Sequence, residues 1–96
     1  MIGVTEKELE IIKNILLPYR NKYQIFAYGS RVKGNFRMLS DLDLMIKGKS
    51  QAEISDIEDL KEKFDDSSLS YIVNIVDYYS LSESFYGIIE SDLIRI

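Results

Sequence analysis

The chain has 96 residues, which is enough for one domain with a modest hydrophobic core. Its formal net charge of −4 argues against a dedicated nucleic-acid binder, because that class usually carries a basic excess, so we expect no direct nucleic-acid binding. Since the sequence contains no Cys and no His, it excludes disulfides, thiolate metal sites and histidine general bases. Any acid–base or metal chemistry must therefore use carboxylates.

Nothing in the sequence indicates a membrane or secreted protein. No apolar run approaches the roughly 20 residues of a membrane helix, and the N-terminal residues lead into a polar helix start rather than a signal peptide. We therefore expect a cytoplasmic protein with no membrane partner. Because no repeat, linker or low-complexity tract is visible, we expect a single domain over residues 1–96.

The first third of the chain predicts a helix, a strand and a short helix. Thr5 and Glu8 have the form of a capping box, and apolar residues follow at helical spacing as far as Pro18. Residues 23–28 are rich in β-branched and aromatic side chains, which predicts a buried strand. Residues 30–34 favour a short helix that ends at its glycine.

The middle of the chain predicts a strand followed by a longer helix. Residues 41–46 alternate acidic and apolar side chains and then become wholly apolar, which is typical of a strand with one polar end. Ser50 with Glu53 forms a second possible capping box. The helix that follows has an apolar face made by Ile54, Ile57, Leu60 and Phe64.

The last third predicts a strand over residues 71–77, a helix over residues 82–90 and a short strand over residues 93–96. The expected apolar face of that helix consists of Phe85, Ile88 and Ile89. The element order predicts an α/β (α+β) domain, a small mixed sheet with helices packed mainly on one side. The order of the strands in the sheet does not follow from these patterns.

The most informative segment places a Gly-Ser pair ten residues before an Asp-x-Asp pair. Asp41 and Asp43 lie two residues apart in a predicted strand, so their side chains point the same way. Two carboxylates this close repel one another unless a cation lies between them. Mg²⁺ (or Mn²⁺) suits oxygen ligands and bridges substrate phosphates, as nucleotidyl transfer requires. The pattern predicts that Asp41 and Asp43 are catalytic residues and metal ligands.

The Gly-Ser pair and the cations after it are candidate nucleotide-binding residues. Gly29 allows the backbone to approach a phosphate closely, and Ser30 stands at a helix start, where N–H groups favour anions. Arg31 and Lys33 can pair with a triphosphate, although each also fits an ordinary solvated charge. Taken alone, each feature also fits a plain turn; together with the acid pair they favour a nucleotide site.

This spacing resembles the signature of nucleotidyltransferases of the DNA polymerase β superfamily, in particular the minimal nucleotidyltransferase (MNT) group. The resemblance runs from residue 23 to the end of the chain and implies the nucleotidyltransferase fold. The family has a third carboxylate on a later strand, and residues 73–77 match that segment. The position of the third carboxylate, a catalytic one, holds Asn74 here.

Asn74 is the main departure from the family pattern. An amide neither accepts a proton nor offsets a metal's charge, and loss of a general base costs about 10²–10⁴ in rate. Asp77 lies three residues further on, so in a regular strand it faces the other side of the sheet. We therefore expect Asp77 to have a structural role.

The resemblance implies an Mg²⁺-dependent enzyme that transfers a nucleoside monophosphate, first of all AMP from ATP, to a partner protein. MNT proteins pair with helical HEPN proteins as antitoxins, so a HEPN-type partner and a homo- or hetero-oligomer are expected. One interpretation of the C-terminal tyrosines is that they lie at a protein interface: Tyr71, Tyr78, Tyr79 and Tyr86. The alternative is a catalytically weakened nucleotide-binding module that neutralises its partner by binding alone. An aminoglycoside-type transferase is disfavoured, because this sequence shows no acceptor-binding domain.

Overall fold

The computed structural model describes residues 2–96, and Met1, the first residue of the expected 1–96 domain, lies outside the described residues. Eight helices and strands follow one another: α1 (Glu6–Leu16), β1 (Gln24–Tyr28), α2 (Ser30–Lys33), β2 (Leu42–Lys47), α3 (Ile54–Asp65), β3 (Val73–Asp77), α4 (Glu83–Ile89) and β4 (Ile94–Arg95). Three short 3₁₀ turns join them: η1 (Leu17–Tyr19), η2 (Tyr78–Ser80) and η3 (Glu90–Asp92). None of the helices in this part of the chain has the length and apolar character needed to cross a membrane.

The four strands form one mixed sheet in the order β3-β2-β1-β4. β2 and β3 run parallel and are connected through α3, whereas β1 pairs antiparallel with both β2 and β4. The expectation of a small mixed sheet is therefore confirmed. The strands begin or end within two residues of the predicted limits, which is the usual uncertainty of an element boundary.

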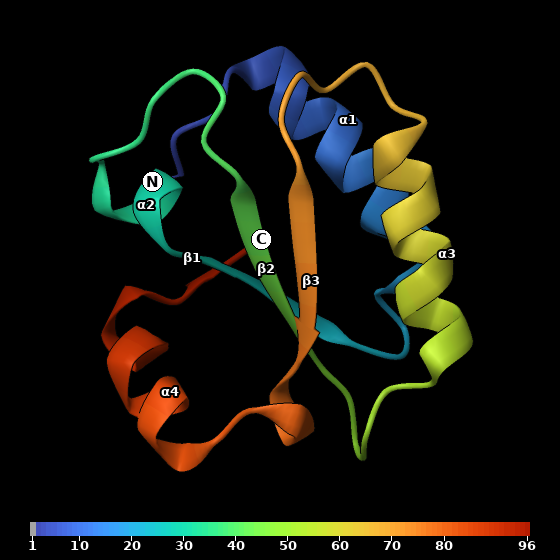
Figure 1. The fold of residues 1–96 in the computed structure, drawn as a ribbon. Coiled ribbons are helices and arrows are strands. Elements are labelled where there is room, and N and C mark those ends of the chain that lie inside the picture. The colour runs from blue at the N-terminus through green and yellow to red at the C-terminus, as the bar shows by residue number, and fades with distance from the viewer. Residues whose placement is uncertain (1) are drawn as a thin grey trace.

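The two faces of the sheet are covered unequally. In Figure 1, α1 and α3 lie side by side on one flank of the strands, and α4 lies on the opposite flank. The larger core lies under α1 and α3 and includes the inward residues of all three long strands. A smaller cluster, formed around Tyr28, Met45 and Ile89, lies where α4 covers part of the second face. The rest of that second face is left for polar side chains.

The N-termini of α1 and α3 show which of the two predicted capping boxes forms. The first capping box is confirmed, because Thr5 N donates to Glu8 Oε1 at 2.8 Å and Glu8 N donates to Thr5 Oγ1 at 3.1 Å. The second predicted capping box is wrong, since Glu53 itself is the N-cap of α3 and Ser50 lies outside the helix. Ile54, at the first helical position, is 73% exposed and does not belong to the buried face.

The predicted apolar face of α4 is only partly correct. Ile89 is buried against the sheet, but Ile88 is 66% exposed and Phe85 lies at the edge of the cluster. Tyr86 takes the inward position three residues before Ile89. Tyr86, which the predicted apolar face did not include, thus packs against the sheet.

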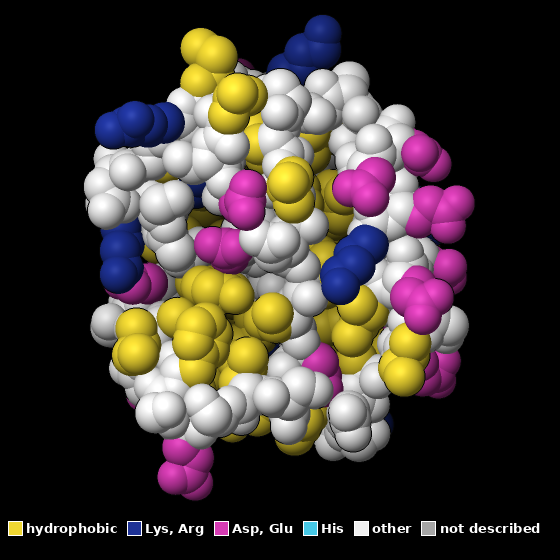
Figure 2. Space-filling view, in the orientation of Figure 1, with side chains coloured by type: hydrophobic (Ala, Val, Ile, Leu, Met, Phe, Trp, Pro, Cys, Tyr) yellow, Lys and Arg dark blue, Asp and Glu magenta, His cyan; other side chains and the backbone are white. Residues whose placement is uncertain are grey.

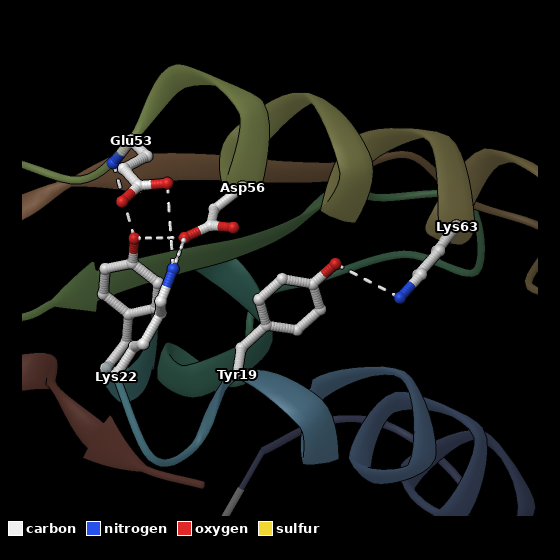
Figure 3. Close-up of polar contacts among 6 residues, drawn as sticks. Tyr19, Lys22, Glu53, Asp56 and Lys63 are labelled. Carbon is white, nitrogen blue, oxygen red and sulfur yellow. Dashed lines mark hydrogen bonds and ion pairs between the residues drawn. The ribbon is translucent and has the colours of Figure 1, made fainter.

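A polar network fastens α3 to the segment between α1 and β1 (Figure 3). Tyr23 Oη donates to Asp56 Oδ2 at 2.6 Å, and Lys22 Nζ approaches the same oxygen at 3.2 Å. At the other end of α3, Lys63 Nζ donates to Tyr19 Oη at 3.1 Å. These contacts hold the crossover helix in place, and with it the parallel pairing of β2 and β3.

Candidate active site

Three polar side chains meet on the second face of the sheet. The side-chain amide of Asn74 donates from Nδ2 to Asp41 Oδ2 at 3.1 Å and to Asp43 Oδ1 at 3.0 Å. Asp43 and Asn74 are direct partners in the register of β2 and β3. Because side chains alternate along a strand, Leu42 and Leu44 point into the main core while Asp43 points away from it. The structure thus brings together all three predicted catalytic residues.

Asp41 reaches this point from outside the sheet. The predicted strand includes it, but β2 begins one residue later, at Leu42, and Asp41 is exposed. Its carboxylate nevertheless shares the Asn74 amide with Asp43. The position of Asp41 therefore depends on the loop that precedes β2 and not on strand pairing.

Gly29 lies against the acid pair. Its backbone has φ 82° and ψ −158°, a region that essentially only glycine adopts. A Cβ atom at this position would lie 2.5 Å from Asp43 Oδ2. Ser30 begins α2 directly after it, and Gly34 ends that helix at φ 90°, as predicted. The backbone of the Gly-Ser turn and the carboxylate of Asp43 are therefore immediate neighbours.

The structure corrects the expectation for Arg31. This side chain is only 3% exposed, unlike the solvent-facing cation that a triphosphate contact requires. Its guanidinium stacks on Tyr71, 3.8 Å from the ring centroid, and donates to four backbone carbonyls. The acceptors are the oxygens of Gly3 (2.6 Å), Arg37 (3.4 Å), Met38 (2.8 Å) and Ser40 (2.8 Å). Arg31 is thus part of the interior.

Lys33 remains at the surface but has a partner. Its Nζ lies 3.5 Å from Asp92 Oδ2, which joins α2 to η3, and its side chain is 49% exposed. An exposed pair of this kind is weak and exchanges easily for another anion. The contact between Lys33 and a nucleotide phosphate stays a prediction.

Tyr28 belongs to the same neighbourhood and was not among the predicted site residues. It pairs with Asp43 in the register of β1 and β2, and its ring packs edge-on against Phe85 with centroids 6.1 Å apart. Burial raises the pKa of the Tyr28 hydroxyl, and the Asp43 charge raises it further. Tyr28 directly precedes Gly29 in the sequence, but its pairing with Asp43 depends on a strand order that no local pattern reveals.

Asp77 does not take part in this group. It is buried on the same side of β3 as Val73 and Ile75, the face that packs on the main core. Its Oδ2 accepts a long hydrogen bond of 3.4 Å from Ser80 Oγ in η2. The expectation that Asp77 faces away from the acid pair is confirmed.

The oxygen donors of the site fit a hard divalent cation, although the donor set carries less negative charge than three carboxylates would. Within residues 2–96 no group of three His, Cys, Asp or Glu side chains is placed to hold a metal. Asp41 and Asp43 supply two carboxylates, and Asn74 can supply a neutral amide oxygen if the amide turns over. Oxygen donors of this kind are those that Mg²⁺ prefers. In the space-filling view, acidic side chains stand near the middle of this face, above a group of hydrophobic ones (Figure 2).

Sequence comparisons identify the family of the chain. A family model described as polymerase beta, nucleotidyltransferase matches residues 10–94. The chain is also 38% identical over 88 residues to a probable protein adenylyltransferase MntA of Haemophilus influenzae. That alignment covers 92% of this chain and 77% of the relative.

Solved structures show the same fold. A crystal structure of a mutant MntA–HpeT toxin–antitoxin complex matches with a TM-score of 0.73 at 21% identity, over 97% of this chain and 72% of that chain. A toxin–antitoxin structure with AMP-PNP also gives 0.73, at 22% identity, over 90% of this chain and 69% of that chain. The sequence match and the shared fold establish that the chain belongs to the polymerase β nucleotidyltransferase family and, within it, to the minimal nucleotidyltransferases that include MntA.

Proposed function

We propose that this protein is an Mg²⁺-dependent nucleotidyltransferase that transfers AMP from ATP to a hydroxyl group of a partner protein. The observation that carries the proposal is the convergence of Asp41, Asp43 and Asn74 beside the Gly29 turn. The choice of AMP and of a protein acceptor is supported by the relative named as a protein adenylyltransferase. The similar structure with AMP-PNP supports ATP as the donor.

The transfer is an in-line substitution at the α-phosphorus. The acceptor oxygen forms a new bond to phosphorus, the bond to the oxygen that bridges to the β-phosphate breaks, and pyrophosphate leaves. Asp41 and Asp43 would hold the metal, and the turn at Gly29 and Ser30 would hold the phosphates. When bound, Mg²⁺ supplies positive charge that stabilises the leaving oxygen. Because Asn74 cannot accept a proton, the acceptor's proton passes to solvent and the reaction is slow.

The acceptor in this proposal is a HEPN-type helical toxin, which makes the chain an antitoxin. Two of the similar structures are toxin–antitoxin structures, which supports a role in such a pair. Transfer of AMP to a side-chain hydroxyl of the toxin adds a bulky, negatively charged group at that position. The modified toxin then stays inactive after the two proteins separate.

A second candidate function is supported by the hydrogen bonds of Asn74. Its amide satisfies both carboxylates, so the arrangement is complete with no cation between them. A protein of this kind binds nucleotide weakly and neutralises the toxin by covering it, without covalent transfer. This alternative differs from the first in needing neither carboxylate for neutralisation.

Titration calorimetry with ATP, in Mg²⁺ and in EDTA, tests the nucleotide site. The proposal expects binding that depends on Mg²⁺, that is lost in Asp41→Ala and that is kept in Asp59→Ala, an exposed acid on α3. Radiolabelled ATP incubated with a co-expressed HEPN-type protein then tests transfer. If Asp43→Ala stops both labelling and neutralisation, the enzyme is supported; neutralisation that survives this change supports the binding module.

A further inference from the structure

We propose that Arg31 is a positioning residue, whose buried guanidinium holds the loop over residues 35–40 so that Asp41 stands against Asp43 and Asn74. The inference rests on the proposed function only in taking Asp41 and Asp43 as the metal ligands. It assigns Arg31 a role different from the phosphate contact that its place in the Gly-Ser motif suggests.

The contacts of Arg31 are those of a clamp on the backbone. Nε donates to the Ser40 carbonyl at 2.8 Å and Nη2 donates to the Met38 carbonyl at 2.8 Å, so two sides of the guanidinium bind the same loop. Nη1 donates to the Gly3 carbonyl at 2.6 Å, which ties the loop to the N-terminal segment. A planar fork with several fixed donors can do this, whereas the compact ammonium group of lysine cannot.

The environment of the charge supports the same interpretation. Burying a cation is costly unless hydrogen bonds and favourable dipoles surround it. Among the described residues no acidic side chain forms an ion pair with Arg31. The ring of Tyr71 at 3.8 Å and the ring of Phe36 at 5.0 Å contact the guanidinium instead. Carbonyl dipoles and aromatic faces therefore stabilise the buried charge of Arg31. The guanidinium in turn holds the uncharged backbone of the loop in place.

Two of the large apolar side chains of this loop are exposed. Met38 is 83% exposed and Leu39 is 66% exposed, so neither anchors the loop in the core. A short internal link is present, since Arg37 N donates to Ser40 Oγ at 2.8 Å and Ser40 N donates to the Arg37 carbonyl at 3.1 Å. Together with the contact between the Phe36 ring and the guanidinium, the hydrogen bonds from Arg31 connect this loop to the interior.

The clamp joins the separate pieces of the site. Arg31 directly follows Ser30 of the phosphate turn, and the Ser40 carbonyl that it binds directly precedes Asp41. Tyr71, on which it stacks, lies three residues before Asn74. Because Asp41 lies one residue before β2, strand pairing alone does not fix it, and the clamp holds the residue on its other side, Ser40. The ten residues that separate the Gly-Ser pair from Asp41 are thus the segment that the hydrogen bonds of Arg31 hold together.

The first test is made on the free, isotope-labelled protein by NMR. The Asn74 side-chain amide, identified by its loss in Asn74→Asp, reports directly on Asp41, because it donates to that carboxylate. The proposal expects Arg31→Lys to move these resonances in the direction that Asp41→Ala moves them. Arg37→Lys, an exposed arginine in the same loop, is the matched control and leaves them in place.

The second test uses the affinity for Mg²⁺-ATP measured by calorimetry. Loss of a residue that orients a metal ligand typically weakens binding by about 10–100-fold, and we expect this for Arg31→Lys. Arg37→Lys, the matched control, keeps the affinity of the unmodified protein. A residue that only stabilises the fold would lower the melting temperature without lowering this affinity.

The outcomes separate this proposal from the proposed function. If Arg31→Lys lowers the melting temperature but leaves the Asn74 resonances unchanged, the clamp is overturned. If the unmodified protein binds no Mg²⁺-ATP, the proposed function fails, while the resonances still decide the role of Arg31.

A second pair of variants applies if Arg31→Lys does not fold. Tyr71→Leu removes the stacked ring, whereas Tyr71→Phe keeps it and removes only a buried hydroxyl that makes no hydrogen bond within residues 2–96. The proposal expects the Asn74 resonances to shift in the first variant and not in the second. Equal behaviour of the two variants contradicts it.

Discussion

Gly29 leaves the space that the Asp43 carboxylate occupies. A Cβ atom on Gly29 would come within 2.5 Å of Asp43 Oδ2, and the positive φ of 82° independently disfavours any other residue. In the proposed function, the close approach of backbone and carboxylate places the candidate phosphate and metal sites side by side, which is the geometry that nucleotidyl transfer needs. Two independent features therefore require glycine at this position: the backbone conformation and the absence of a side chain.

The Gly29→Ala variant should lose both stability and nucleotide binding. The backbone conformation alone costs about 1–3 kcal/mol for a residue other than glycine, and the added methyl group must displace the Asp43 carboxylate. Gly34→Ala is the matched control, because its φ is also positive, at 90°, but among the described residues no atom beyond its immediate surroundings in the chain lies within 4 Å of the added Cβ. Urea unfolding should show a loss in both variants. Calorimetry with Mg²⁺-ATP should show a loss only in Gly29→Ala.

The Asn74→Asp variant should gain transfer activity. If the third carboxylate acts as a general base, restoring it raises the rate by about 10²–10⁴. The metal-free variant should be less stable, because a third carboxylate replaces the amide that now donates to Asp41 and Asp43. Mg²⁺ should then raise its melting temperature more than it raises that of the unmodified protein.

The control for this change is Asn14→Asp, which adds the same charge at an exposed position of α1. Label transfer from ATP and thermal melting, each with and without Mg²⁺, are the measurements. A variant that transfers no faster than the unmodified protein contradicts the role of this position in proton transfer.

Acid should weaken the attachment of α3. The hydrogen bond from Tyr23, followed by the contact with Lys22, lowers the pKa of Asp56 below its ordinary value of 3.8. Because the folded pKa lies below the unfolded one, this stabilisation is complete above pH 3.8 and is lost as pH falls through the folded pKa. Urea unfolding followed by circular dichroism should show a smaller acid-dependent loss in Asp56→Asn. Asp59→Asn, at an exposed position of the same helix, should behave like the unmodified protein.

High pH should destabilise the folded protein through ionisation of Tyr71. Burial, with a further contribution from Glu8, raises the pKa of Tyr71 from 10 to about 12. A raised folded pKa means that this stabilisation is complete below pH 10 and is lost as pH rises from 10 to about 12. Tyr71→Phe cannot ionise, so its free energy of unfolding should fall less over this range. Tyr79→Phe, at a tyrosine that is 44% exposed, should follow the unmodified protein; if the two variants fall equally, the assignment to Tyr71 is wrong.

Local sequence signals predicted those features that depend on neighbouring residues. The Thr5 and Glu8 capping box, the stop at Gly34 and the shared direction of Asp41 and Asp43 each involve residues within four positions, and the structure shows all three. Ser50 failed as a cap because the helix begins at the residue after Glu53. Residue spacing alone does not show which of two nearby polar residues is the N-cap of the helix.

Features that depend on distant residues could not be predicted in this way. The pairing of Tyr28 with Asp43 follows from strand order, which no local pattern contains. The burial of Arg31 was missed for a related reason, since its partners are mostly backbone carbonyls, which every sequence has. A charged residue in a loop motif is expected at the surface, and only the folded chain shows that the loop closes around it.

The amide of Asn74 separates folding from metal loading. Where three carboxylates meet, the folded state depends on a cation, and apparent stability rises and falls with the supply of that ion. Here the Nδ2 group already bridges Asp41 and Asp43, so the sheet can close in register before any ion or nucleotide arrives. If the protein has the proposed function, it can therefore fold before it binds nucleotide, and the Asn74 amide must rotate when a metal enters.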